Sequence, residues 1–311
     1  MWTLLLSLAL AADPLPELTP GSITADSPRG KLGDRLGWGD GADLILLYGG
    51  EQAGRVGPCG CEDHPIGGLP RTAGYRAALA KANPGVPLLL LNPGHFYSAR
   101  TGDTVALAEH ALYANTWMHT GLNAGGWDAL NVTCRDVPGS IVEGFPEGAL
   151  STNLRLAGLP THRIVESGGL SVAVLGVATA CLDYLQPEGL SVLDPLEAVA
   201  ALAPTLEADL VVVLASDLSG RVEDLAHLDG VDVVLEAGEY AGRYDPFEVD
   251  GTLWLRSLRE TQRLKELRLQ LSEGRVSAAR DRTITLDDKV PDDRALKKLL
   301  AEPLSLEARA R

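Results

Sequence analysis

The residues of this chain with the clearest chemical potential are two cysteines, Cys59 and Cys61, which are separated by one glycine in a long loop. The loop follows an apolar, strand-like run over 44–48 and precedes a helix-like run over 71–82. Loops between a strand and a helix often carry chemistry in α/β proteins, and a loop of roughly twenty residues in a compact domain is usually functional or disordered. The sequence therefore predicts a first candidate site in this loop.

The two thiols fit more than one role. A disulfide between Cys59 and Cys61 would close a small ring, with Gly60 absorbing the bend, and strained disulfides are the easily reduced ones. The pair would then be a redox centre, in which one thiol attacks a disulfide of a partner protein and the other resolves the mixed disulfide. Alternatively, each cysteine pairs with Cys134 or Cys181 as an ordinary structural disulfide.

A metal site is the third role. Cys134 and His95 each follow a strand-like run, so both are able to approach Cys59 and Cys61, and three thiolates with one imidazole are a ligand set for zinc. His64 lies three residues beyond Cys61, where it could join such a site or activate the thiol; a solvated loop histidine is an equal alternative. The residues leave the redox, structural and metal interpretations open.

Strand-like and helix-like runs alternate after residue 42. Expected strands cover 44–48, 87–92, 129–132, 162–166, 170–177, 210–214 and 231–235, and expected helices cover 71–82, 105–120, 195–206 and 221–228. Three successive antiparallel strands are then expected over 252–255, 264–271 and 275–285, before a charged terminal helix over 292–311. This order predicts an α/β sheet with an added β layer.

The ends of the expected strands should meet at one place, because ligands gather at the carboxyl ends of the strands in such sheets. The strand ends that should face this site are Tyr48, Asn92, Val132, Leu214 and Leu235. Three carboxylates lie around the last of them, and we interpret Asp232, Glu236 and Glu239 as a solvated acidic rim.

Short motifs mark these strand ends: Glu51-Gln52-Ala53, Gly94-His95, Thr133-Cys134-Arg135-Asp136, Asn153-Leu154, Ala215-Ser216-Asp217, and the stretch from Asp232 to Tyr240. In the same order, they resemble the motifs Asp-x-His, Gly-Asp, Gly-Asn-His-Glu, Asn-Leu, Ser-His and Gly-Gly-His-x-His of the metallophosphoesterase domain of periplasmic 5′-nucleotidases, the UshA-like group. The resemblance covers most of Gly41 to about Thr285. It implies an α/β fold of metallophosphoesterase type, a four-layer α/β/β/α sandwich.

The same resemblance implies where the family holds its metals. The degenerate metal-ligand positions are Glu51, Ala53, His95, Cys134 and Ser216. Two-metal hydrolysis needs a bridging carboxylate and several His or Asp ligands, and His95 stands where the bridging Asp is expected. We therefore expect the ancestral hydrolysis to be lost. The alternative is a residual phosphoesterase that uses an altered set of ligands for zinc or another divalent metal, including Glu51, His95 and Asp136.

The cysteine loop resembles a narrower subgroup of UshA-like proteins. The matching residues are Pro58-Cys59-Gly60-Cys61 and Gly67-Gly68-Leu69-Pro70-Arg71. Some members of that subgroup are selenoproteins, and selenocysteine serves redox chemistry. The resemblance therefore implies a thiol redox function with Cys59 and Cys61 as catalytic residues and a redox protein as partner. A residual phosphoesterase and a non-catalytic binding or scaffold protein are the alternatives.

The bulk properties limit the partners. The net charge of −15 repels the phosphates of nucleic acids, and no apolar run is long enough to span a membrane. Residues 1–12 predict a signal peptide, because a short apolar run ends in Ala9-Leu10-Ala11, which fits a cleavage site. A periplasmic or secreted protein is expected, with an N-terminal arm over 13–42, one domain over 43–290 and a helix over 291–311. Its oligomeric state is left open.

Overall fold

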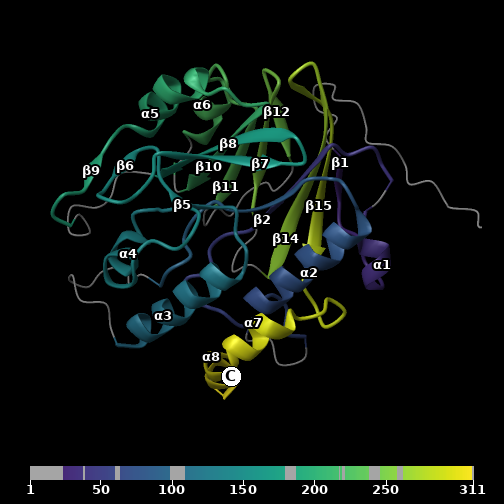
Figure 1. Ribbon diagram of the computed structural model, residues 1–311, viewed down its shortest axis with the longest axis vertical. Helices are drawn as coiled ribbons and strands as arrows, with labels where there is room; N and C mark the ends of the chain where they lie inside the picture. The colour runs from purple at the N-terminus through teal and green to yellow at the C-terminus, as the bar shows by residue number, and fades with distance from the viewer. Residues whose placement is uncertain are drawn as a thin grey trace, which may run out of the picture.

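Two β-sheets pack face to face, and helices cover their outer sides, which gives four layers (Figure 1). The computed structural model describes residues 24–37, 39–59, 64–98, 109–178, 187–216, 218, 221–237, 246–257 and 262–309. The predicted signal peptide, Cys61, Cys181 and Glu239 lie outside the described residues. The four-layer α/β/β/α sandwich expected from the sequence is confirmed.

The first sheet has a parallel half and an antiparallel half. Its strands in spatial order are β1 (Thr24–Asp26), β15 (Arg275–Thr285), β14 (Arg263–Ser272), β2 (Leu44–Tyr48), β3 (Leu88–Asn92), β4 (Ala129–Asn131) and β5 (Ala149–Leu150). The strands from β2 to β5 run parallel, whereas β14 pairs antiparallel with both β2 and β15. Strand β1 lies in the predicted N-terminal arm and pairs in parallel with β15, so the arm extends the sheet.

The second sheet has a parallel centre. Its order is β12 (Phe247–Val249), β13 (Thr252–Arg256), β11 (Val233–Ala237), β10 (Leu210–Ser216), β8 (Leu170–Ala178) and β7 (His162–Ser167). Strands β8, β10, β11 and β13 are parallel, and β12 and β7 are antiparallel edges. A separate pair joins β6 (Leu154–Arg155) to β9 (Ser191–Val192).

The pairing predicted for 252–255 is wrong. We expected this segment to continue into an antiparallel run with 264–271, but β13 pairs in parallel with β11 in the second sheet. Leu253 and Leu255 face the first sheet, while Trp254 packs toward the outer helices. A strand covered on both faces is typical of the parallel part of a sheet, which explains the observed pairing.

The helices form the two outer layers (Figure 1). They are α1 (Leu32–Arg35), α2 (Leu69–Ala82), α3 (Glu109–Ala124), α4 (Val137–Glu143), α5 (Pro195–Leu202) with the short 3₁₀ turn η2 (Ala203–Thr205), α6 (Val222–Ala226), α7 (Arg294–Leu299) and α8 (Ala301–Arg309). The α2, α3 and α7 helices cover the first sheet, and α5 and α6 cover the second. The terminal helix expected over 292–311 is divided into α7 and α8 at the fully buried Leu300.

Strand alternation builds three apolar cores from these layers. Because neighbouring residues of a strand point to opposite faces, Ile45 and Leu47 of β2 join the core under α2 and α3. Leu44 and Leu46 of the same strand join the core between the two sheets. The third core lies between the second sheet and α5 and α6. The two sheets are therefore held together along an apolar interface, and their strand ends meet beside it.

Buried charges connect the first sheet to α2. Arg268 of β14 donates to both oxygens of Asp40, at 2.5 and 2.8 Å, and to Glu266 at 3.0 Å. Arg282 of β15 and the hydroxyl of Tyr75 in α2 also donate to Glu266, at 2.9 and 2.6 Å. Burial alone would raise the pKa of Asp40, but the hydrogen bond and charge of Arg268 outweigh it and lower that pKa. This cluster neutralises each buried charge and joins three elements.

Removal of the Glu266 carboxylate should destabilise the fold strongly. In the Glu266→Ala variant, Arg268 and Arg282 lose a shared acceptor while they remain buried, and breaking a buried ion pair from one side costs about 3–5 kcal/mol of unfolding free energy. Urea denaturation followed by circular dichroism measures this change. The Glu166→Ala variant, which removes an exposed carboxylate on β7, is the matched control and should unfold like the wild type. Equal denaturation midpoints for the two variants would contradict the structural role of the cluster.

Candidate functional site

The loops after β2 and β3 lie side by side at the carboxyl edge of the first sheet. The backbone amide of Glu51 donates to the carbonyl of Gly94 at 2.9 Å, and the amide of Ala53 donates to the carbonyl of His95 at 3.0 Å. These bonds extend the register of the two parallel strands beyond their ends. The sequence prediction that these two strand ends share one place is therefore confirmed by the backbone.

The backbone of these loops is strained. Glu51, Ala53 and His95 have φ angles of 60°, 49° and 62°, in the left-handed region that residues with a Cβ rarely adopt. Ala53 precedes Gly54 in a turn that the hydrogen bond from the amide of Arg55 to the carbonyl of Gln52 closes, and Asp250 and Glu273 each precede a glycine in a turn between antiparallel strands, so the conformation is ordinary at these three positions. Among the described non-glycine residues, Glu51 and His95 are left without such a turn. Strain that is not required by a turn tends to occur at functional sites, which marks this edge as one.

Asp136 holds the loop after β3 in place through hydrogen bonds to its backbone. Its carboxylate accepts hydrogen bonds from the backbone amides of His95 at 3.1 Å, Tyr97 at 2.9 Å and Thr133 at 3.0 Å, and from the Thr133 hydroxyl at 2.6 Å. The residue is completely buried, and this burial raises its pKa, while the nearby His95 ring and the hydrogen bonds of Thr133 and Tyr97 act in the opposite direction. Asp136 therefore fixes the position of His95 through the backbone.

Three polar side chains converge at the loops that Asp136 holds. The Nδ1 atom of His95 lies 3.9 Å from the Oε1 atom of Glu51, and its Nε2 atom lies 3.4 Å from the hydroxyl oxygen of Ser216. Glu51, His95 and Ser216 are 7%, 4% and 0% exposed. Ser216 is the last residue of β10 in the second sheet. The site therefore joins the carboxyl edges of both sheets, as the resemblance implied for the ends of these strands.

Three buried amide side chains complete the edge, and the sequence analysis assigned no role to them. Asn92 donates to Gln52 at 3.0 Å and accepts from the amide of Gly94 at 2.8 Å. Asn131 donates to the carbonyls of Pro93 and Val177, and so connects the end of β3 to β8 of the other sheet. Asn92 and Asn131 are polar residues that end apolar strands, and this position is the signal that could have identified them.

The residues at this edge do not fit a two-metal centre. Ala53 has no ligand atom, and Arg135 stands where the resemblance places a histidine. Asp136 already accepts four hydrogen bonds, three on Oδ2 and one on Oδ1, so this carboxylate is engaged in holding the loops. Within the described ranges, no three His, Cys, Asp or Glu side chains are grouped so that they could hold a metal ion. Glu51 and His95 are a carboxylate and an imidazole that could supply two ligands to a single divalent ion.

The cysteine loop is anchored on several sides. Cys59 is a buried thiol whose amide donates to the carbonyl of Ile66 at 2.8 Å, and whose sulfur accepts from the amide of Ile66 at 3.4 Å. Arg71 donates to the carbonyls of Pro65 and Leu286. In α8, the carboxylate of Glu307 accepts from the amides of Val56 and Gly57 at 3.2 and 2.8 Å. The C-terminal helix therefore holds the start of this loop.

The other predicted thiol ligands are placed in part. Cys134 is disulfide-bonded, and the sulfur to which it is joined lies outside the described residues. A disulfide sulfur is not a thiolate, so a zinc site that includes Cys134 would require the reduced protein. His64 is exposed. With Cys61 outside the described residues, the proposed three-thiol site stays a prediction.

One prediction about the acidic residues near β11 is wrong. Glu236 is 2% exposed and is not part of a solvated rim. Its carboxylate accepts from Arg256 at 2.7 Å and from the indole of Trp254 at 3.0 Å, both on the neighbouring strand β13. These partners compensate the burial of the charge. Asp232 accepts from the amide of Val211 at 2.7 Å.

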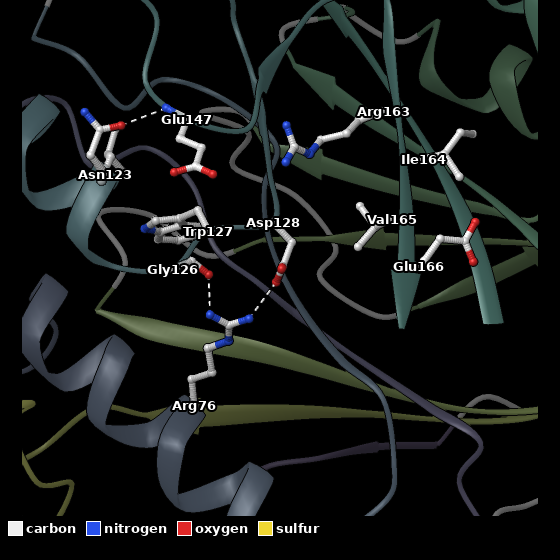
Figure 2. Close-up of a pocket in the computed structure, with 11 residues that line it drawn as sticks. Arg76, Asn123, Gly126, Trp127, Asp128, Glu147, Arg163, Ile164, Val165 and Glu166 are labelled. Atoms are coloured by element: carbon white, nitrogen blue, oxygen red, sulfur yellow. Dashed lines mark hydrogen bonds and ion pairs between the residues drawn. The ribbon is translucent and has the colours of Figure 1, made fainter. Parts of the chain in front are cut away.

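A cavity of about 380 Å³ lies at the opposite edge of the sheet, where Trp127 and Asp128 lead into β4 (Figure 2). Arg76 enters it from α2 and binds both Asp128 and the carbonyl of Gly126 (Figure 2). Arg163 and Glu166 of β7 also line it. Because this edge carries the amino ends of the parallel strands, the cavity is separate from the site at the carboxyl ends.

The arrangement of the sheets is a known fold. Two sheets in a four-layer sandwich, with polar residues at the carboxyl ends of parallel strands from both sheets, form the fold of calcineurin-like metallophosphoesterases. No family model and no curated protein matches the sequence. In the part of the chain that the structure describes, no helix is long and apolar enough to cross a membrane.

Solved structures with the same fold are similar to this chain. The sulfate thiohydrolase SoxB of Thermus thermophilus is similar with a TM-score of 0.68 and 17% identity, over 85% of this chain and 61% of that one. A 5′-nucleotidase precursor of the same organism is similar with a TM-score of 0.67 and 18% identity, over 86% and 60%. The calcineurin-like phosphoesterase YfkN of Bacillus subtilis is similar with a TM-score of 0.64 and 14% identity, over 86% of this chain and 98% of that one. The chain thus spans about three fifths of the length of the two Thermus proteins.

The Asp136→Asn variant should weaken the site frame. An asparagine presents one accepting oxygen and an NH2 group that only donates, so it cannot accept all the hydrogen bonds that hold His95, Tyr97 and Thr133. Leaving buried donors unpaired costs about 1–3 kcal/mol of unfolding free energy. Thermal unfolding measures the loss. Asp288→Asn, at an exposed position, is the isosteric control and should leave the melting temperature unchanged. An Asp136→Asn variant as stable as the wild type would contradict the role of this carboxylate.

Proposed function

We propose that the chain is a hydrolase that cleaves an ester bond at the carboxyl edge, where the loops after β2, β3 and β10 meet. The observation that carries this proposal is the convergence of Glu51, His95 and Ser216 on a strained and hydrogen-bonded backbone. The fold supports hydrolysis as the reaction class, because the similar solved structures include a 5′-nucleotidase precursor and a phosphoesterase. A fold alone does not determine an activity, so the site has to carry the argument.

The proposed reaction does not use two metals, because the residues at this edge do not fit such a centre. The reaction is compatible with either no metal or one divalent ion, and in the second case Glu51 and His95 would hold the ion, which would act as a Lewis acid on the substrate. Added metal is therefore a variable of the assay. Phosphate esters belong in the substrate panel on account of the fold, and carboxylic esters belong there because the site has a hydroxyl next to an imidazole.

The purified protein should hydrolyse at least one of p-nitrophenyl phosphate, bis(p-nitrophenyl) phosphate and p-nitrophenyl acetate. Each substrate is assayed with EDTA, with Mn²⁺ and with Zn²⁺. The activity of the His95→Asn variant should be at least about a hundredfold lower, the lower end of what one acid–base group contributes. Asparagine tolerates the left-handed backbone of this position, so the variant tests the imidazole and not the fold.

The matched control is His162→Asn on β7, which should keep the wild-type rate. Release of p-nitrophenol at the rate of buffer alone, for all three esters under all three conditions, would end the proposal.

A thiol function is the second candidate, and a specific observation favours it. Cys59 is a thiol in a protein in which Cys134 is disulfide-bonded, so both oxidation states of cysteine are present. A thiolate attacks a disulfide directly. Cys61 would be the resolving thiol, as the sequence predicts. The predicted export to an oxidising compartment would maintain the disulfide. The similar solved structures bear on hydrolysis and not on this chemistry, so the thiol function stands behind the first candidate.

Disulfide mapping tests the second candidate. If Cys59 takes part in exchange, a small dithiol should reduce the disulfide of Cys134 more slowly in the Cys59→Ser variant than in the wild type. The redox state of each cysteine is read by alkylation and peptide mass spectrometry at fixed times. Identical reduction rates in the two proteins would assign Cys59 a packing role. The thiol is only 3% exposed, so alkylation of Cys59 itself should require urea.

A further inference from the structure

At the carboxyl edge, an imidazole lies between a serine hydroxyl and a carboxylate. Ser216 is next to one ring nitrogen of His95, Nε2, at 3.4 Å, and Glu51 is next to the other, Nδ1, at 3.9 Å. A nucleophile, a base and a group that orients the base are recognised by this order of contacts and not by the fold that carries them. In ligand-free proteins such contacts are often long, and they shorten when substrate binds.

We propose that Ser216, His95 and Glu51 form a relay that hydrolyses small, uncharged carboxylic esters, with Ser216 as the nucleophile, His95 as the general base and Glu51 as a positioning residue. This inference rests on the hydrolase function proposed above and names its nucleophile and its substrate class. It uses the same positions at which the resemblance places metal ligands. The arrangement requires no metal ion.

Each member of the relay sits on a fixed backbone. Ser216 ends β10, where parallel neighbours on both sides hold its position in the register, Ala178 of β8 and Ala237 of β11. The amide of His95 is bound by Asp136, and its carbonyl accepts from Ala53. Reactive groups on rigid elements keep the geometry that a reaction needs.

Gly94 allows the two sheets to bring these groups together. A Cβ atom at this position would lie 2.3 Å from Cγ2 of Thr133 and 3.4 Å from Cβ of Ser216. Its φ of 134° is also a conformation that other residues rarely adopt. Glycine therefore permits the loop that carries His95 to lie directly against the end of β10. The glycine at position 94 is thus the sequence feature that lets His95 lie next to Ser216.

The charges at the edge select the substrate class. Among the described residues, the carboxyl groups of Glu51 and Asp136 lie next to His95, and Arg256 forms an ion pair with Glu236. A phosphate monoester would bring negative charge close to carboxylates, which is unfavourable in a buried site. An uncharged carboxylic ester avoids this repulsion. The near-complete burial of Ser216 limits the acyl group to a small one, such as acetyl.

Gln52 supplies a donor of the kind that this reaction needs. Its side chain is buried and is oriented by the hydrogen bond from Asn92 to Oε1. Within the described part of the chain, no acceptor lies within hydrogen-bond distance of its Nε2 amide. A preorganised N–H donor stabilises the oxyanion that forms when an ester carbonyl is attacked. Gln52 follows Glu51 in the chain, so this donor lies at the same edge.

The proposed reaction balances with water as the second reactant. The Ser216 oxygen forms a bond to the carbonyl carbon of the ester, and its proton moves to Nε2 of His95. The bond from that carbon to the leaving oxygen then breaks, and His95 returns the proton to the alcohol. Water attacks the acyl group on Ser216 with His95 again as the base. The carboxylic acid leaves, and the serine hydroxyl is restored.

Covalent labelling tests the relay in the full chain. Methanesulfonyl fluoride, a probe about the size of an acetyl ester, should form an adduct that peptide mass spectrometry locates on Ser216. The His95→Asn variant should lower the labelling rate at least about a hundredfold. The Ser216→Ala variant should abolish both labelling and hydrolysis of p-nitrophenyl acetate in EDTA. Ser171→Ala, near the opposite end of β8, is the control and should behave as the wild type.

The role of Glu51 has its own readout. Glu51→Gln should reduce kcat for p-nitrophenyl acetate, and Glu51→Asp should restore part of it, while both variants melt like the wild type. A carboxylate that only supports the fold would not give this rescue.

The outcomes separate the two proposals. Hydrolysis that persists in Ser216→Ala, or labelling that does not depend on His95, would overturn the relay and leave the hydrolase function standing. Absence of hydrolysis of every ester together with absence of an adduct would overturn both. If Ser216→Ala fails to fold, Ser216→Cys replaces it, and its thiol should react with iodoacetamide faster than the thiol of the Ser216→Cys, His95→Asn double variant. Equal rates would overturn the relay.

Discussion

The hydrogen bonds of one buried carboxylate hold the working edge of this protein together. Asp136 accepts hydrogen bonds from the amides of His95 and Tyr97 in the loop after β3, and from the amide and hydroxyl of Thr133 in the loop after β4. A single side chain therefore fixes two loops that begin on different strands. Asp136 precedes α4 but makes no side-chain hydrogen bond to that helix. The fold uses this residue to place a histidine, at the cost of removing a carboxyl group from water.

The polar side chains at the carboxyl edge contact one another, and this distinguishes the edge from a two-metal centre. Two-metal chemistry needs several anionic and imidazole ligands that converge without neutralising one another. Here the convergence is retained, but the side chains contact each other instead: an imidazole lies between a carboxylate and a hydroxyl, and amides connect the strand ends. Internal contacts of this kind replace the electrostatic attraction that an ion would otherwise provide.

Much of the fold could be predicted, because burial leaves a clear mark on sequence. Strand β2 was predicted with the observed limits, since it is covered on both faces and reads as a continuous apolar run. Strand β1 has three residues, and α4 contains a proline and a glycine within seven, so neither has a periodic signal. The pairing of β13 depends on what covers both of its faces, which local sequence does not reveal.

The sequence predicted where the site residues lie in the fold, but not which side chains they contact. Glu51, His95 and Ser216 could each be assigned to a strand end, which placed them at one edge. Their mutual contacts depend on side-chain directions and on the left-handed backbone at Glu51 and His95, and His95 and Ser216 are 121 residues apart in the chain. The amides Gln52, Asn92 and Asn131 lie at or near strand ends, but the sequence assigns them no chemistry, and their burial and hydrogen bonds in the structure show that they belong to the site.

The attachment of the cysteine loop to α8 has a consequence for the order in which the chain folds. Glu307 binds the amides of Val56 and Gly57 across about 250 residues of sequence, and contacts between such distant segments form late because of the entropy of closing the intervening chain. The surroundings of Cys59 are therefore completed near the end of folding. In the folded protein its sulfur is enclosed. Oxidation of Cys59 is therefore expected to compete with the docking of α8.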